Sequence, residues 1–305
     1  MFYPRVFSVV IAVALFSLSP LPAFSGGKGE PPAPLKPVMA VSILPQAYFA
    51  GYIGGDRIQT IVLAGPGQNP HTYEPSPKQM ADLAGAGAWI LSGTEFEISL
   101  RPKIEALFPK LRIIDGTRGV RFRTLEVPEE EDPDHPQEGD LSIDRHTWLG
   151  AEPAKIMAAH IRDACTGLDP GGAAWYGANY EALIGEIDGE FRRLKQELEP
   201  LRGKAVFVYH PAFGYFLDEF GIRQEAVETG GKEPTPRILN ALIARARREG
   251  AAAIFVQAQF PVNAARTVAA SVGAELIALD PLSPDWLANI RIMGAALQKA
   301  LGEGR

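Results

Sequence analysis

Three histidines and one aspartate are the residues of this chain best suited to act together: His71, His146, His210 and Asp280. Three neutral imidazoles and one carboxylate form a mixed nitrogen and oxygen ligand set, which suits Zn²⁺ at distances of about 2.0–2.2 Å. Mn²⁺ prefers more oxygen ligands, and copper(I) prefers sulfur ligands, which these four residues do not offer. We therefore predict a zinc-type site assembled from four distant segments, with manganese as the second candidate.

A proline-rich segment presents the first of these residues. Residues Gly67–Pro77 read Gly-Gln-Asn-Pro-His-Thr-Tyr-Glu-Pro-Ser-Pro and lie between the apolar run Ile58–Leu63 and a predicted helix. Proline fixes its own backbone φ and restricts the residue before it, so this loop has little conformational freedom. We expect the loop to hold the imidazole of His71 in one place.

Two of the four residues directly follow predicted strands. His210 follows Ala205–Tyr209, and Asp280 follows Glu275–Leu279. Open parallel sheets bind their ligands outside the carboxyl ends of their strands. We therefore expect both side chains to face the same crevice. His146 lies beside an aromatic residue in another loop.

Each histidine taken alone is more often a satisfied polar residue than a metal ligand, so the prediction depends on the joint pattern. The chain has five histidines, and three of them lie in separate loops rich in proline, glycine or aromatic residues. We interpret the other two, His135 in an acidic segment and His160 on a predicted helix, as solvated or structural. Cys165 is the single cysteine, so no internal disulfide can form, and we predict a buried side chain there.

The elements that must position these residues follow an alternating pattern. Short apolar runs alternate with helical patterns on both sides of a long helical segment, Pro170–Leu201. Such alternation predicts parallel sheets covered by helices. We predict an α/β fold of two parallel-sheet lobes joined by one long backbone helix, with the metal site in the cleft between the lobes. The predicted limits are 37–168 for the N-terminal lobe, 169–201 for the linker helix and 202–305 for the C-terminal lobe.

The start of the chain fits an export signal. Residues 1–25 contain Arg5, the apolar run Val6–Leu18 and small residues at a cleavage site before Gly26. The apolar run is shorter than the roughly 20 residues that a membrane span needs, although an uncleaved anchor is the alternative. Residues 26–36 read as a flexible leader. No cysteine follows the cleavage site for lipid attachment, so we expect a soluble periplasmic protein after cleavage.

The composition excludes some partners. The chain of 305 residues is 46% hydrophobic and 22% charged, as in an ordinary globular protein, and its formal net charge is −6. Phosphate binding needs clustered basic residues, so nucleic acid and anionic membranes are disfavoured as partners. The segment Glu126–Asp140 is rich in acidic residues and proline, and we predict a solvated loop there.

A short internal similarity suggests two related halves. The segment Glu74–Leu83 matches Glu233–Leu242 closely, and each contains a Ser or Thr followed by a proline. Ser or Thr is a favoured N-cap, and proline fits the first position of a helix. We predict that each half begins an equivalent helix in this way, with coincidence as the alternative.

Five motifs together resemble the zinc and manganese substrate-binding proteins of bacterial ABC transporters. In sequence order they are Pro70–Pro77, Asp144–Trp148, Tyr209–Tyr215, Glu233–Pro236 and Leu279–Leu282. The resemblance extends from about Val38 to Leu301 and implies the two-lobed fold with metal ligands at His71, His146, His210 and Asp280. A histidine at the position of His210 goes with zinc-type members of this family. The resemblance thus implies a monomeric, non-enzymatic protein that captures Zn²⁺ and delivers it to an ABC permease and its ATPase.

The chain departs from the family pattern at three places. The acidic segment Glu126–Asp140 stands where zinc members often have a histidine-rich loop. Arg145 stands where proline is common, and Gln257 stands at a strand end where glutamate is common. These departures concern the surroundings of the predicted ligands and leave the four ligand positions themselves intact.

Two functions of other classes fit the same composition. An exported zinc hydrolase would keep an open metal position for water and a general base nearby, but the chain has no His-Glu-x-x-His or Gly-x-Ser-x-Gly motif. An exported adhesin is also compatible, because a fold does not determine a function. Surface binding that survives mutation of all four predicted ligands would distinguish the adhesin.

Overall fold

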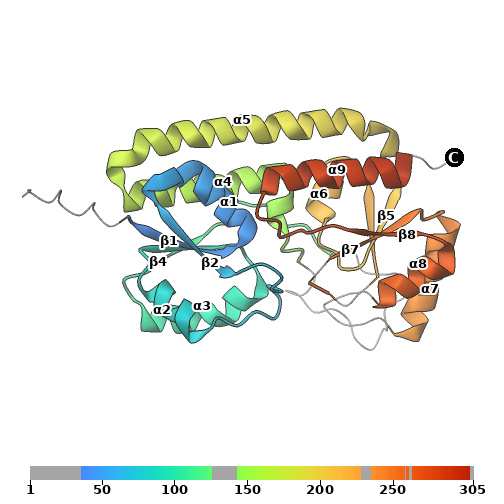
Figure 1. Ribbon diagram of the computed structural model, residues 1–305, viewed down its shortest axis with the longest axis horizontal. Coiled ribbons are helices and arrows are strands. Elements are labelled where there is room, and N and C mark those ends of the chain that lie inside the picture. Colours follow the sequence, from blue (N-terminus) through green and yellow to red (C-terminus); the bar gives the residue numbers. More distant parts are fainter. Residues whose placement is uncertain (1–35, 126–142, 228–234, 258, 261–262, 303–305) are drawn as a thin grey trace, which may run out of the picture. The chain divides into compact units, whose positions relative to one another are not determined.

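The computed structural model describes residues 36–125, 143–227, 235–257, 259–260 and 263–302 (Figure 1). These residues belong to one compact unit, Lys36–Arg305. The predicted signal peptide, the leader up to residue 35, the whole acidic segment 126–140 and the Glu-Pro pair at 233–234 lie outside the described residues, so the predictions made for them stay predictions.

The first sheet contains four parallel strands in the order β2-β1-β3-β4. Their limits are β1 Val38–Ile43, β2 Gln59–Ala64, β3 Ala88–Leu91 and β4 Arg112–Asp115. Strand β1 is central and nearly fully buried, which explains its apolar sequence. Helices α1 (Leu44–Gly54), α2 (Pro77–Ala84) and α3 (Glu95–Leu107) connect these strands, and α4 (Ala151–Leu168) packs against α1 and β3.

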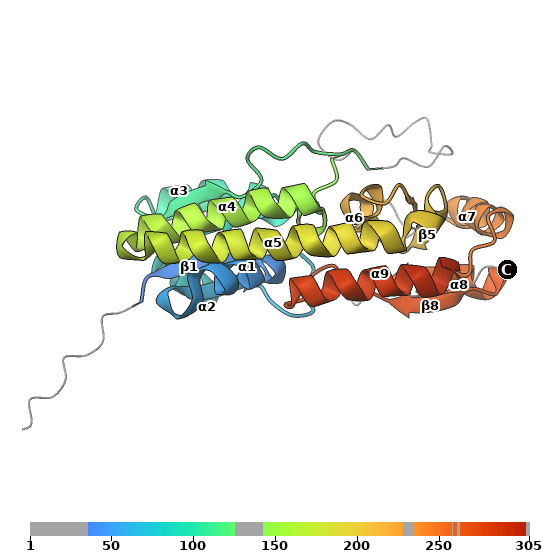
Figure 2. The same ribbon diagram turned by 90° about the horizontal axis from the view of Figure 1, so that it is seen from above.

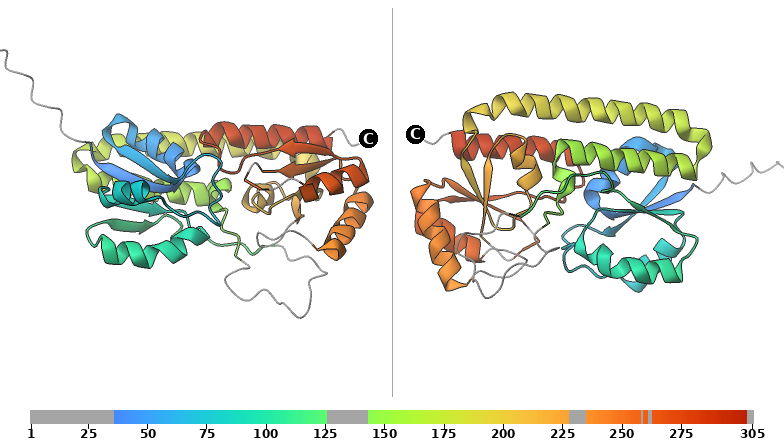
Figure 3. Two further views of the ribbon diagram at one scale, coloured as in Figure 1. Left: turned by 60° about the horizontal axis from the view of Figure 1, so that its bottom comes forward. Right: turned by 180° about the vertical axis from the view of Figure 1, so that it is seen from behind.

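The second sheet repeats this arrangement with the order β6-β5-β7-β8, again all parallel. Its strands are β5 Ala205–Val208, β6 Arg223–Ala226, β7 Ala253–Val256 and β8 Glu275–Ala278. The helices of this lobe are α6 Gly214–Asp218, α7 Pro236–Arg248, α8 Asn263–Val272 and α9 Trp286–Gly302. Helices α7 and α8 pack together beside this sheet (Figure 3). Two parallel-sheet lobes confirm the predicted fold class.

The long helix that follows the first sheet and precedes the second in sequence is α5, Ala173–Glu197, with 25 residues. The predicted helical run Pro170–Leu201 contains this helix and a 3₁₀ turn at each end, Pro170–Gly172 and Glu199–Leu201. Proline in the second turn cannot donate the backbone bond that would continue an α-helix. Figures 1 and 2 show α5 running alongside α4 and α9. The predicted lobe limits at 168 and 202 stay predictions.

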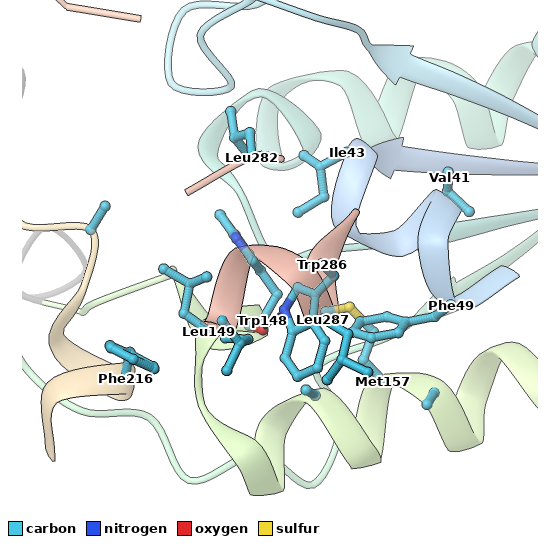
Figure 4. Close-up of a cluster of buried hydrophobic side chains, with 14 of the residues drawn as sticks. Val41, Ile43, Phe49, Trp148, Leu149, Met157, Phe216, Leu282, Trp286 and Leu287 are labelled. Carbon is cyan, nitrogen blue, oxygen red and sulfur yellow. Dashed lines mark hydrogen bonds between the residues drawn. The ribbon is translucent and has the colours of Figure 1, made fainter. Parts of the chain in front are cut away.

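A continuous buried core extends from the first lobe to the second. Trp148 and Trp286 belong to this core, and the ring of Trp286 lies 5.1 Å from that of Phe49 (Figure 4). The indole Nε1 of Trp148 donates to the carbonyl of Pro281 over 2.8 Å, and the Nε1 of Trp286 donates to the carbonyl of Trp148 over 2.7 Å. Both buried indoles therefore have a hydrogen-bond acceptor, and each bond joins segments from different halves of the chain.

The predicted internal similarity marks equivalent helix starts. Helix α2 begins at Pro77 after the N-cap Ser76, and α7 begins at Pro236 after Thr235. Each helix follows the second strand of its own lobe. Among the described helices, none has the combination of length and apolar composition needed to cross a membrane.

Candidate metal centre

The structure brings His71, His146 and His210 together. Each offers one ring nitrogen, and these three nitrogens all lie within 4.8 Å of one another. The Nε2 atom of His210 is 3.0 Å from Nε2 of His71 and 3.1 Å from Nε2 of His146. His146 and His210 are buried, whereas His71 is partly exposed. Three imidazoles from distant segments therefore converge on one point.

Local backbone contacts position His71. The side chain of Asn69 accepts from the backbone N–H of His71 over 3.0 Å, which forms a tight turn within the proline-rich loop. The loop ends at Ser76, whose hydroxyl accepts from the backbone N–H of Gln79. Capping of α2 thus fixes the chain on one side of His71, and the turn fixes it on the other.

The other two histidines are held at the ends of regular elements. His146 precedes a 3₁₀ turn, Thr147–Leu149, and its backbone N–H donates to Asp144 over 3.0 Å. His210 follows β5, where the side chain of Gln257 donates to its carbonyl over 2.8 Å and accepts from its N–H over 3.3 Å. Because Gln257 follows the neighbouring strand β7, this amide joins the ends of two adjacent strands at the site.

Two carboxylates contact the far sides of the imidazoles. Glu95 lies 2.8 Å from Nδ1 of His71, and Asp144 lies 2.8 Å from Nδ1 of His146. A carboxylate at Nδ1 fixes the proton there, which leaves the lone pair of Nε2 facing the centre of the group. The tautomers are assigned from these contacts. The arrangement is the one that a nitrogen-ligated cation requires.

The electrostatics keep these groups in the ionisation states that metal binding needs. Burial alone would raise the pKa of Asp144, but its bonds with His146 and Arg123 outweigh this effect and lower it. Burial also opposes ionisation of Glu95, and contact with His71 again lowers its pKa. Burial and the nearby His146 and His71 hold the pKa of His210 well below its usual range. At neutral pH the carboxylates are therefore charged and His210 is neutral.

The structure does not place Asp280 in the histidine group. Its Oδ1 atom accepts from the backbone N–H of Leu282 over 2.9 Å and from Nε2 of Gln259 over 2.8 Å. Gln259 and Leu282, which donate to Asp280, line the same pocket as the three histidines. The role predicted for Asp280 as a fourth ligand stays a prediction.

A pocket lined by residues of both lobes gives access to the histidines. Phe260 forms part of its wall and stacks on His210, with ring centroids 4.3 Å apart. On the opposite side, Trp148 contacts the ring of His146 edge-on at 5.4 Å. Aromatic surfaces thus surround the polar group and limit the number of waters that reach it.

His160 and Cys165, to which we assigned no ligand role, lie away from the three histidines. His160, on α4, contacts the carbonyl of Arg118 at 2.8 Å, which agrees with a structural role. Cys165 is fully buried in the core, and burial raises its pKa to about 12, so the predicted burial is confirmed. His135 lies outside the described residues.

Sequence reasoning did not identify the carboxylates behind the imidazoles. Asp144 lies in the same short motif as His146, and its spacing of two residues was a usable signal. Glu95 lies in the first turn of α3, far from His71 in sequence, and nothing in its neighbourhood marked it. Arg145, noted as unusual, donates to the carbonyl of Gly93 over 3.1 Å, next to Glu95.

The protein has two α/β lobes and three converging imidazoles, and carboxylates contact the imidazoles of His71 and His146. These features define a candidate metal-binding protein. The chain belongs to the family described as ZnuA, zinc-uptake complex component A, periplasmic, whose model matches residues 39–300. This membership confirms the resemblance to zinc and manganese substrate-binding proteins. The family is one of substrate-binding transport proteins and not a family of enzymes.

Similar proteins agree with this assignment. The crystal structure of ZnuA is 32% identical and has a TM-score of 0.79, covering 87% of this chain and 99% of that chain. The zinc-binding lipoprotein AdcA of Streptococcus pneumoniae is 25% identical over 248 residues, 80% of this chain and 50% of that protein. The high-affinity zinc uptake system protein ZnuA of Brucella abortus is 31% identical over 144 residues, 47% of this chain and 43% of that protein. The matched parts span about half the length of these two relatives or less.

Proposed function

We propose that this protein captures Zn²⁺ in the periplasm and delivers it to an ABC-type permease and its ATPase. The observation that carries the proposal is the convergence of His71, His146 and His210 on one point. The names of the similar proteins, which refer to zinc binding and zinc uptake, support the choice of ion. Export to the periplasm is supported by the family description and by the signal-like sequence at residues 1–25.

The donor set favours zinc over manganese. Zn²⁺ takes nitrogen ligands in a four-coordinate geometry, and three histidines supply three of the four positions. Mn²⁺ prefers oxygen ligands, yet the carboxylates of Glu95 and Asp144 are engaged by imidazole Nδ1 atoms. Asp280 is our candidate for the fourth ligand, and it would have to leave its bond with Gln259 or bind through its other oxygen. Manganese remains the second candidate.

The same contacts support binding without catalysis. A zinc hydrolase needs a general base close to an open metal position. Glu95 and Asp144, which contact two of the histidines, each lie 2.8 Å from an imidazole Nδ1. The role we assign is therefore capture: Zn²⁺ loses water, the imidazoles bind it, and the loaded protein meets the permease as a monomer.

A titration of metal-free protein with zinc, in competition with a chelator of known affinity, tests the proposal. We expect a tight one-to-one complex for the parent protein. His210→Ala should weaken binding by more than about 100-fold, because losing even the outer partner of a ligand costs about 10–100-fold. His160→Ala is the matched control, since His160 contacts a backbone carbonyl on the surface of α4, and it should bind like the parent. A parent without a tight complex, or His210→Ala with parental affinity, would refute the proposal.

Asp280→Ala tests the fourth ligand separately. If the carboxylate binds the ion, its removal takes away one of four donors and the negative ligand, and we expect binding to weaken by at least about tenfold. Unchanged affinity would show that the three histidines hold the ion without it. Metal analysis of protein purified without added metal, followed by competition between zinc and manganese, identifies the preferred ion.

A further inference from the structure

Arg123 contacts a carboxylate on each side of the metal site. Its Nη1 donates to Oδ2 of Asp144 over 2.7 Å, and its Nε donates to Oδ2 of Asp218 over 2.9 Å. Asp144 belongs to the segment that carries His146, whereas Asp218 ends α6 in the second lobe. The arginine side chain is only 14% exposed. One guanidinium therefore bridges the two lobes beside the site.

The two oxygens of Asp144 have separate partners. Oδ1 accepts from the backbone N–H of His146 over 3.0 Å and contacts its Nδ1 at 2.8 Å. Oδ2 accepts from Arg123. The carboxylate is fully buried, and a buried charge is costly unless it is paired and hydrogen-bonded. Arg123 supplies this pairing and fixes the rotation of the carboxylate that orients His146.

The start of α6 is shaped around this guanidinium. A Cβ atom at Gly214 would overlap the Arg123 side chain and lie 2.8 Å from Asp144. The hydroxyl of Tyr215 accepts from the backbone N–H of Arg123 over 3.0 Å and donates to the carbonyl of Asp144 over 3.1 Å. Because α6 begins four residues after His210, the element that contacts Arg123 and Asp144 also continues the segment that carries His210.

We propose that Arg123 is a positioning residue for zinc binding: it orients the imidazole of His146 through Asp144 and couples that imidazole to α6, next to His210. The inference rests on the proposed function, because it names the residue that sets the geometry of the zinc ligands. Arg123 itself touches no ion. Its guanidinium fork matters as well as its charge, since two carboxylates at different angles share it.

The test compares four variants of the full chain with the parent, using zinc competition titration, stopped-flow zinc release and the visible spectrum of the Co²⁺-loaded protein. Arg123→Met should weaken zinc binding by about tenfold, speed release and alter the Co²⁺ spectrum. Arg123→Lys keeps the charge without the fork and should recover part of the affinity. Asp218→Asn keeps the bond between Arg123 and Asp144, so it should retain the parental spectrum with a smaller change in release rate.

Arg57→Met is the matched control. Arg57 pairs with Asp169 and Tyr176, away from the residues that support the histidines. It should lower thermal stability without changing zinc affinity or the Co²⁺ spectrum.

Three outcomes overturn the inference. Parental affinity, release and spectrum in Arg123→Met would show that the arginine has only a structural role, while leaving the proposed function intact. If Arg123→Met does not fold, Arg123→Lys with parental release and spectrum has the same meaning. A parent that binds no zinc would refute the proposed function, and the role of Arg123 with it.

Discussion

At the scale of single residues, the carboxylates behind His71 and His146 decide which ring nitrogen of each is left for an ion. Asp144 is fully buried and contacts His146, whereas the carboxylate of Glu95 is 39% exposed and contacts His71. The Oε2 atom of Glu95 that contacts His71 is itself buried, but Asp144 also accepts from Arg123 and from the backbone N–H of His146. The two carboxylates therefore contribute unequally to zinc affinity, although their contact distances are the same.

This difference gives a prediction. Asp144→Asn should weaken zinc binding by about 10–100-fold, because the amide can present its N–H₂ group toward Nδ1 and no longer fixes the proton there. Glu95→Gln should weaken it by less than about tenfold. Competition titrations of both variants measure the ratio, and a larger loss in Glu95→Gln would contradict the importance that we give to the further bonds of Asp144.

The converging histidines could be found from sequence, but most of their supports could not. His71 and His210 were found because a proline-rich loop and a strand end are local features. Asp144 contacts His146 within one short motif, whereas Glu95 contacts His71 from a separate segment and Arg123 bridges residues separated by most of a lobe. Asp280 follows β8 as expected and accepts from Gln259 and Leu282, and its role as a ligand stays a prediction.

At the scale of elements, alternation of strands and helices was enough to predict both sheets. The apolar run of β1 and the proline that begins α2 are strong local signals, and the structure has both elements. The length of α5 was harder to predict, because a 3₁₀ turn directly adjoins the helix at each end. Proline marks the end of an α-helix only where its missing N–H removes a backbone hydrogen bond of that helix.

Glycines in two helices allow a matched pair of predictions at this scale. A Cβ at Gly185 in α5 would meet no atom within 4 Å, and the residue is exposed. Gly185→Ala should therefore stabilise the protein by about 0.5–1 kcal/mol, because alanine has the higher helix propensity. Gly214→Ala should destabilise it, since the new methyl group displaces Arg123.

Urea unfolding of both glycine variants, followed by circular dichroism, measures the two changes in free energy. Zinc titration should show parental affinity for Gly185→Ala and weaker binding for Gly214→Ala. Equal effects of the two substitutions would mean that α6 can move away from the guanidinium without cost.

At the scale of the whole molecule, the metal-free protein should lose stability as the pH falls. The pKa of His210 in the folded protein lies well below the value of about 6.5 expected in the unfolded chain, first because it is buried and then because of His146 and His71. Below about pH 6.5 the unfolded state therefore binds a proton that the folded state does not. In this pH range the free energy of unfolding therefore decreases as the pH falls. The protonation of His210 alone accounts for up to about 1.4 kcal/mol per pH unit.

Urea unfolding of chelator-treated protein at pH 7.5 and pH 5.5 measures this loss. His210→Asn removes the group, and its free energy of unfolding should change less between the two pH values. The lowered pKa values of Asp144 and Glu95 act in a separate window, below about pH 4, where those carboxylates become protonated. The same pH dependence in His210→Asn and in the parent would exclude His210 as the cause.

The histidines are divided unequally between the two halves of the chain. His71 and His146 precede α5, and His210 follows it. A nascent polypeptide that has completed only its first half offers two of the three imidazoles and cannot retain the cation. Bound zinc would then indicate that the chain is fully synthesised and folded. A transporter that accepts only zinc-loaded molecules would therefore not bind incomplete chains.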